Sequence, residues 1–116
     1  MARVLLVDDD VDALALRKRI FEREGYSVST ASSPLVARER FRGDTPDSVV
    51  IDLRLPDPED GLTLIREFRA AAPHLKIVVL AGWCADLDGR NESAMVDVVL
   101  SKPARSEVLL RAVKSS

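Results

Sequence analysis

The feature that most constrains this chain is the alternation of five short apolar runs with stretches of helical spacing. Three runs are continuous and rich in β-branched residues, which is typical of strands buried on both faces of a parallel sheet. The other two contain polar positions and suit the edges of the sheet. The three buried runs are residues 4–7, 49–51 and 77–80, and the two edge runs are residues 26–31 and 96–100.

Apolar residues between these runs recur with the period of a helix. The first predicted helix directs five apolar side chains toward the sheet, namely Ala13, Leu14, Leu16, Ile20 and Phe21. Similar spacing predicts helices around residues 34–42, 65–72 and 108–113. Residues 85–95 have almost no apolar stripe, so we expect a short or poorly ordered helix there.

Strands and helices that alternate in this way form parallel sheets with right-handed crossovers. The sequence therefore predicts one α/β domain over residues 1–116, a three-layer sandwich with helices on both faces of the sheet. Ligands in such folds bind beyond the carboxyl ends of the strands. Residues with useful chemistry should therefore come directly after the predicted strands.

Acidic and basic residues do follow the predicted strands. Asp8 and Asp9 come directly after the first run, Asp52 ends the third, and Lys102 follows the fifth. Because the carboxyl ends of parallel strands meet at one edge, these groups are expected to converge. The acids after the first run could simply cap the first helix. Their combination with Asp52 and Lys102 favours a functional site.

The charges of these groups indicate a metal site. Ionised Asp8, Asp9 and Asp52 would repel one another unless a cation neutralised them. Mg²⁺, a hard ion that takes carboxylate and water ligands, would do so together with the ammonium of Lys102. Such a site suits phosphoryl transfer, with Asp52 as the nucleophile that forms an acyl phosphate.

Three segments together resemble the signature motifs of two-component response-regulator receiver domains. They are Leu-Leu-Val-Asp-Asp-Asp at 5–10, Asp-Leu-Arg-Leu-Pro at 52–56 followed by Gly61, and Leu-Ser-Lys-Pro at 100–103. The resemblance covers the whole chain. It implies a flavodoxin-like (βα)5 fold whose five-stranded parallel sheet has the order 2-1-3-4-5.

The resemblance also implies roles for these residues. Asp52 would accept a phosphoryl group from a sensor histidine kinase, a phosphotransfer protein or a small phosphodonor, and Lys102 would contact the phosphoryl oxygens. The Lys102–Pro103 bond would be cis. An effector domain or protein would contact the fourth helix, fifth strand and fifth helix, and the chain would be a signalling module rather than an enzyme. Mg²⁺ would be held by Asp8, Asp9, Asp52 and the backbone carbonyl of Arg54.

Several positions depart from the pattern of the family. Ala81 lies beside the expected phosphoryl group, where receivers usually have Thr or Ser, and Val99 replaces the usual switch aromatic. The backbone N–H of Gly82 could still contact the phosphoryl group, but the usual relay to the surface would be absent. Arg54 and Trp83 occupy positions that flank the phosphoryl group in the family. We expect them to shield it and to lengthen its lifetime.

The same residues bear on three other possible functions. A haloacid-dehalogenase phosphatase also uses an Asp nucleophile and Mg²⁺, but it requires Thr or Val where this chain has Asp12. A flavin site would need hydroxyls and glycine where the first loop has acids. A pseudo-receiver, a protein-interaction module that works without phosphorylation, is favoured by Ala81 and Val99. The complete set of acids and lysine disfavours it.

The net charge and the cysteine content indicate in which compartment the chain works and which ligands it does not bind. A formal charge of −2 and a pI near 5.4 argue against direct binding of nucleic acid. The single cysteine, Cys84, cannot form an internal disulfide, and the run at 4–7 is too short to span a membrane. We therefore expect a chain of the reducing cytoplasm that does not bind membranes.

Overall fold

The computed structural model describes residues 2–55, 57–82, 87 and 90–114. Within these residues, five parallel strands form one sheet in the order β2-β1-β3-β4-β5, so the order implied by the resemblance is confirmed. The strands are β1 (Arg3–Val7), β2 (Ser27–Ala31), β3 (Ser48–Asp52), β4 (Lys76–Ala81) and β5 (Val98–Ser101).

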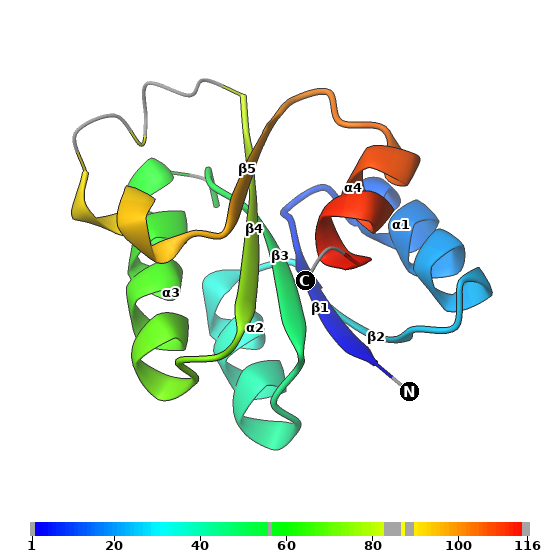
Figure 1. Ribbon diagram of the computed structural model, residues 1–116, viewed down its shortest axis with the longest axis horizontal. Helices are drawn as coiled ribbons and strands as arrows, with labels where there is room; N and C mark the ends of the chain where they lie inside the picture. The colour runs from blue at the N-terminus through cyan, green and yellow to red at the C-terminus, as the bar shows by residue number, and fades with distance from the viewer. Residues whose placement is uncertain (1, 56, 83–86, 88–89, 115–116) are drawn as a thin grey trace.

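Helices cover both faces of the sheet, which confirms the three-layer sandwich. Helices α1 and α4 lie on one face, and α2 and α3 lie on the other (Figure 1). A short 3₁₀ helix, η2, is the described part of the weak helix expected over 85–95. The helical segments are α1 (Val11–Arg23), α2 (Pro34–Gly43), α3 (Pro58–Ala71), η2 (Asn91–Met95) and α4 (Ser106–Lys114).

The core consists of two apolar layers, because successive side chains of a strand point to opposite faces of the sheet. Leu5 and Val7 of β1 pack in the layer under α2 and α3, whereas Val4 and Leu6 pack in the layer under α1 and α4. Every residue of β3 is buried, while β2 and β5 are partly exposed. The two strands expected at the edges are therefore the edge strands of the sheet.

The inward face of α1 differs from the expected stripe. Leu14 and Phe21 are the buried residues of this helix, but Leu16 is 57% exposed. Leu16 follows Leu14 by two residues, or about 200° around the helix axis, so both cannot face the sheet. Arg17 lies three residues after Leu14 and four before Phe21, and it therefore shares the inward face.

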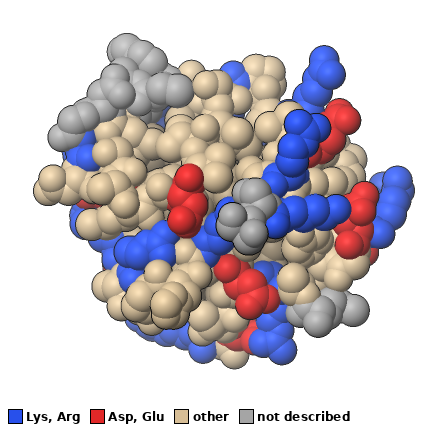
Figure 2. Space-filling view, viewed as in Figure 1, with Lys and Arg blue, Asp and Glu red and all other residues tan. Residues whose placement is uncertain are grey.

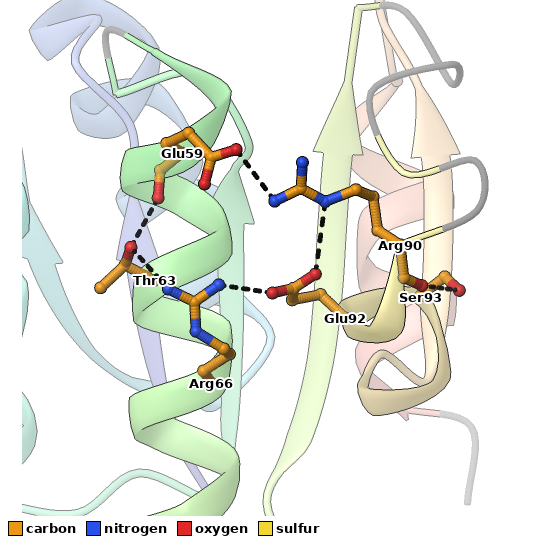
Figure 3. Close-up of polar contacts among 6 residues, drawn as sticks. All are labelled: Glu59, Thr63, Arg66, Arg90, Glu92 and Ser93. Carbon is orange, nitrogen blue, oxygen red and sulfur yellow. Dashed lines mark hydrogen bonds and ion pairs between the residues drawn. The ribbon is translucent and has the colours of Figure 1, made fainter.

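An ionic network attaches η2 to α3 (Figure 3). Glu92 of η2 is only 5% exposed and accepts a hydrogen bond from the guanidinium of Arg66 in α3. Arg90 Nε lies 3.5 Å from Glu92 Oε1, and Arg90 Nη2 donates to Glu59 Oε1 at 2.9 Å. The segment between β4 and β5 is thereby tied to α3 at two points.

Charged side chains of both signs are interspersed over the face that Figure 2 shows. Ion pairs at the surface include Lys18–Glu22 at 2.9 Å within α1 and Lys114–Glu24 at 3.7 Å. Exposed pairs of this kind contribute little to stability. In the described part of the chain, no helix combines the length and the apolar character needed to cross a membrane.

Candidate functional site

The carboxyl ends of β1, β3 and β5 bring Asp8, Asp52 and Lys102 together. Asp8 directly follows β1, and its N–H donates to the carbonyl of Ala31 at 3.1 Å. Asp52 is the last residue of β3. The N–H of Lys102 donates to the carbonyl of Ala81 at 3.0 Å, which holds the start of the next loop against the end of β4. The expected convergence of these strand ends is thus present.

Three carboxylates form a compact group at this edge. Asp8, Asp9 and Asp52 each place one oxygen within 4.8 Å of the others. Asp8 and Asp52 are 2% and 3% exposed, and Asp9 is exposed. A pocket of about 530 Å³ adjoins the group. Its lining residues are Asp8, Asp9, Asp10, Ala13, Arg17, Lys102, Pro103 and Ala104.

Asp52 is buried, and Lys102 is its cationic partner among the described residues. Lys102 Nζ donates to its Oδ2 at 2.5 Å, and the N–H of Arg54 approaches its Oδ1 at 3.4 Å. Burial raises the pKa of Asp52, the hydrogen bond from Lys102 opposes this effect, and the charge of Asp8 adds to it. The net result is a pKa above the ordinary value, so the ionised form of Asp52 depends on its cationic surroundings.

Asp8 is held by donors on both of its oxygens. Its Oδ1 accepts from the N–H of Asp10 at 2.9 Å, and its Oδ2 accepts from Arg17 Nη1 at 2.7 Å. Burial alone would raise the pKa of Asp8, but the Asp10 N–H and the Arg17 guanidinium outweigh it and hold the pKa below its ordinary value. Arg17 was not predicted as a site residue. Its spacing from Leu14 and Phe21 places it on the inward face only once Leu14, rather than Leu16, is known to face the sheet.

The three acids after β1, Asp8 to Asp10, have two different roles. Asp10 is the N-cap of α1, and its Oδ1 accepts from the N–H of Ala13 at 3.1 Å. The capping interpretation is therefore correct for Asp10. Asp8 and Asp9 instead belong to the carboxylate group that includes Asp52.

The atypical positions lie near the same edge or on β5. Ala81 is 1% exposed, and its methyl group packs in the layer under α2 and α3. Gly82 and Arg54 are exposed, and Val99 is 41% exposed. Trp83 lies outside the described residues. The predicted cis bond between Lys102 and Pro103 is confirmed.

The donors present fit a hard divalent cation. The three grouped side chains, Asp8, Asp9 and Asp52, all offer carboxylate oxygens, and the adjoining pocket leaves room for water ligands. This combination of carboxylate and water is the coordination that Mg²⁺ prefers. A cation would also relieve the repulsion between Asp8 and Asp52.

This chain is similar in sequence and in fold to receiver domains. The family model described as "Response regulator receiver domain" matches residues 4–114. Sporulation initiation phosphotransferase F of Bacillus subtilis is 25% identical over 97% of this chain and 90% of that protein. The crystal structure of response regulator TrrA from Thermotoga maritima, in complex with Mg²⁺-BeF, has a TM-score of 0.85 and 28% identity, and the match covers 98% of this chain and 97% of that chain.

Relatives that are more similar in sequence are much longer. Protein-glutamate methylesterase/protein-glutamine glutaminase 1 of Anaeromyxobacter dehalogenans is 38% identical over 80 residues, which are 69% of this chain and 22% of that protein. The matched part of this chain therefore covers about a fifth of the length of that relative. The family match covers nearly the whole chain, and the sheet order agrees with it. This chain belongs to the response regulator receiver domain family.

Proposed function

We propose that this chain, as one receiver domain over residues 1–116, accepts a phosphoryl group on Asp52 in two-component signal transduction. The observation that carries the proposal is a buried Asp52 paired with Lys102 and grouped with Asp8 and Asp9. The donor would be a sensor histidine kinase or a phosphotransfer protein of the cytoplasm. Mg²⁺ would be held by Asp8, Asp9, Asp52 and the backbone carbonyl of Arg54.

The proposed step is a transfer between two nucleophiles. A carboxylate oxygen of Asp52 forms a bond to phosphorus while the bond between phosphorus and the donor nitrogen or oxygen breaks, and the leaving group takes the electron pair. When bound, Mg²⁺ would neutralise charge on the transferring group. The Lys102 ammonium, 2.5 Å from Asp52 Oδ2, is placed to pair with a phosphoryl oxygen after transfer.

The output of the domain would differ from that of ordinary receivers. One relative is named a phosphotransferase, and another, named a protein-glutamate methylesterase, extends well beyond the part that this chain matches. An effector of this chain would contact η2, β5 and α4. Ala81 offers no hydroxyl to the phosphoryl group, which leaves the N–H of Gly82 as the donor at this strand end. Arg54, together with Trp83, would shield the acyl phosphate from water.

Mass spectrometry tests the proposal. The protein is incubated with Mg²⁺ and acetyl phosphate, and one added phosphoryl group is expected in the wild type and in Asp12→Asn, a control at an exposed acid of the first turn of α1. Asp52→Asn is expected to show no added mass. A wild type that gains no mass from acetyl phosphate or from a histidine kinase would refute the proposal.

A phosphorylation-independent receiver is the second candidate. It is favoured by the buried methyl group of Ala81 and by an aliphatic Val99, because neither side chain can relay a phosphoryl signal in the usual way. The same mass measurement separates the two candidates. Absence of phosphorylation, with the fold intact, would support this second function.

A further inference from the structure

Arg17 brings a positive charge into the acidic site from the inward face of α1. Helical side chains lean toward the N-terminus of their helix, so Arg17 extends back over Ala13, one turn earlier. Its Nη1 reaches Asp8 Oδ2 at 2.7 Å, and its side chain is only 17% exposed. Both Ala13 and Arg17 line the pocket beside the carboxylates. Arg17 is thus part of the site, although no motif of the family points to it.

Two basic side chains pair with two of the three carboxylates of the site. Lys102 pairs with Asp52, and Arg17 pairs with Asp8. Asp8 accepts hydrogen bonds on both oxygens, one from Arg17 and one from the Asp10 N–H. A cation that binds Asp8 must therefore share or replace the guanidinium, and it also meets the repulsion of that guanidinium.

We propose that Arg17 is a built-in counter-ion that holds Asp8 in the metal-free site and competes with Mg²⁺ for its carboxylate. Arg17 is thus a positioning residue that sets the affinity of the site for metal. This proposal rests on the metal site of the proposed function.

The same charge gains a second effect after phosphoryl transfer. With Mg²⁺ bound, the three carboxylates, Lys102 and Arg17 carry a formal charge of about +1. Mg²⁺ and Lys102 already neutralise the three carboxylates, so the charge of Arg17 is left over. An acyl phosphate of charge about −2 in place of ionised Asp52 brings this sum to about zero. Arg17 therefore disfavours metal before transfer and balances the phosphoryl charge after it.

Calorimetric titration with Mg²⁺ tests the competition directly. Arg17→Met removes the guanidinium and is expected to bind Mg²⁺ about ten-fold more tightly than the wild type. In the wild type, Mg²⁺ must displace the hydrogen bond from Arg17 to Asp8, and the variant has no such bond to break. Arg17→Lys keeps the charge without the planar fork and should lie between them. Arg19→Met removes the same charge from an exposed position of α1 and should stay within about two-fold of the wild type.

Thermal melting supplies a second readout that does not depend on phosphorylation. In EDTA, Arg17→Met should melt below the wild type because buried Asp8 loses its partner. Addition of Mg²⁺ should raise the melting temperature of Arg17→Met more than that of the wild type. If Arg17→Met does not fold even with Mg²⁺, the Arg17→Lys titration decides, and an affinity equal to that of the wild type counts against the proposal.

The outcomes separate this proposal from the phosphoacceptor function. Equal Mg²⁺ affinity in the wild type and Arg17→Met, or binding in neither, overturns the role of Arg17. The assignment of Asp52 is decided separately by the mass measurement with acetyl phosphate. Tighter Mg²⁺ binding by Arg17→Met without any phosphorylation would support the competition and refute only the acceptor function.

Discussion

Two buried carboxylates in the same site, Asp8 and Asp52, have pKa values shifted in opposite directions. Burial raises both, but Asp8 accepts hydrogen bonds from the Asp10 N–H and from Arg17, and these outweigh burial. For Asp52, the hydrogen bond from Lys102 does not overcome burial and the charge of Asp8. Ionised Asp52 therefore costs free energy in the folded protein, and addition of a cation beside it relieves that cost.

Position 61 requires glycine because α3 approaches the loop after β3 closely there. A Cβ at this position would lie 2.1 Å from the carbonyl oxygen of Leu53 and 2.8 Å from its Cα and carbonyl carbon. Gly61→Ala should lower the free energy of unfolding by about 2–3 kcal/mol, measured by urea denaturation, because backbone must move. Gly43→Ala, with no atom within 4 Å of the new Cβ, should have no cost or a gain of about 0.5 kcal/mol. Similar losses for both variants would contradict this explanation.

The sequence sufficed for the residues at strand ends and failed for a residue on a helix face. Asp8, Asp52 and Lys102 could be placed because parallel strands end at one edge. Arg17 could not be placed, because Leu14 and Leu16 are equally apolar and the sequence does not say which one faces the sheet. Packing of Leu14 against the sheet resolves that choice and turns Arg17 toward Asp8.

Polar contacts to α3 help to hold the segment from η2 to β5, in addition to the apolar contacts of Met95 and Val96 with the core. Besides the Glu92 network, Arg69 of α3 donates to the carbonyls of Pro73, Leu75 and Met95 and to Asp97. Asp97 in turn accepts from the N–H of Ile77 at 2.7 Å. One guanidinium thus connects α3 to the starts of β4 and β5. These contacts explain why the weak apolar pattern of residues 85–95 still leads to an ordered η2.

Glu92 should contribute stability that depends on pH. The hydrogen bond from Arg66 holds the pKa of Glu92 below its ordinary value of 4.5. A lowered folded-state pKa means that the contribution is present above the unfolded pKa and is lost as pH falls through the folded pKa. Glu92→Gln should therefore be about 1 kcal/mol less stable than the wild type at pH 7, with the difference shrinking below about pH 4.5.

Urea denaturation at several pH values measures this difference. Glu59→Gln is the matched control, since Glu59 also pairs with Arg90 but its side chain is 63% exposed. Its effect should stay within about 0.5 kcal/mol at every pH. A Glu92→Gln difference that does not change between pH 7 and the acid range would show that ionisation of Glu92 is not involved.

How far a change at Asp52 extends through the molecule depends on the β5–α4 surface. The β5–α4 surface exposes Val99 and Val108, at 41% and 37%, and lacks an aromatic switch at position 99. We expect beryllofluoride with Mg²⁺ to shift NMR amide signals near the carboxyl ends of the strands but not along β5 and α4. The double variant Ala81→Thr/Val99→Tyr should extend the shifts to that surface.

Val99→Tyr alone is the control for this experiment. It adds the aromatic ring at position 99 but leaves Ala81 without a hydroxyl beside the bound beryllofluoride. Its shifts should remain near the site, as in the wild type. Wild-type shifts that already reach α4 would mean that this chain transmits the signal by another route.

The Asp52–Lys102 pair joins residues 50 positions apart and links the end of the central β3 to the loop after the edge strand β5. A contact with so large a sequence separation forms late, because loop-closure entropy opposes it until the intervening strand has docked. During synthesis, Asp52 leaves the ribosome well before its lysine does. A nascent or partly folded chain therefore presents the aspartate without its ammonium. If Asp52 is the phosphoacceptor proposed above, competence for phosphoryl transfer would arise only when folding is complete.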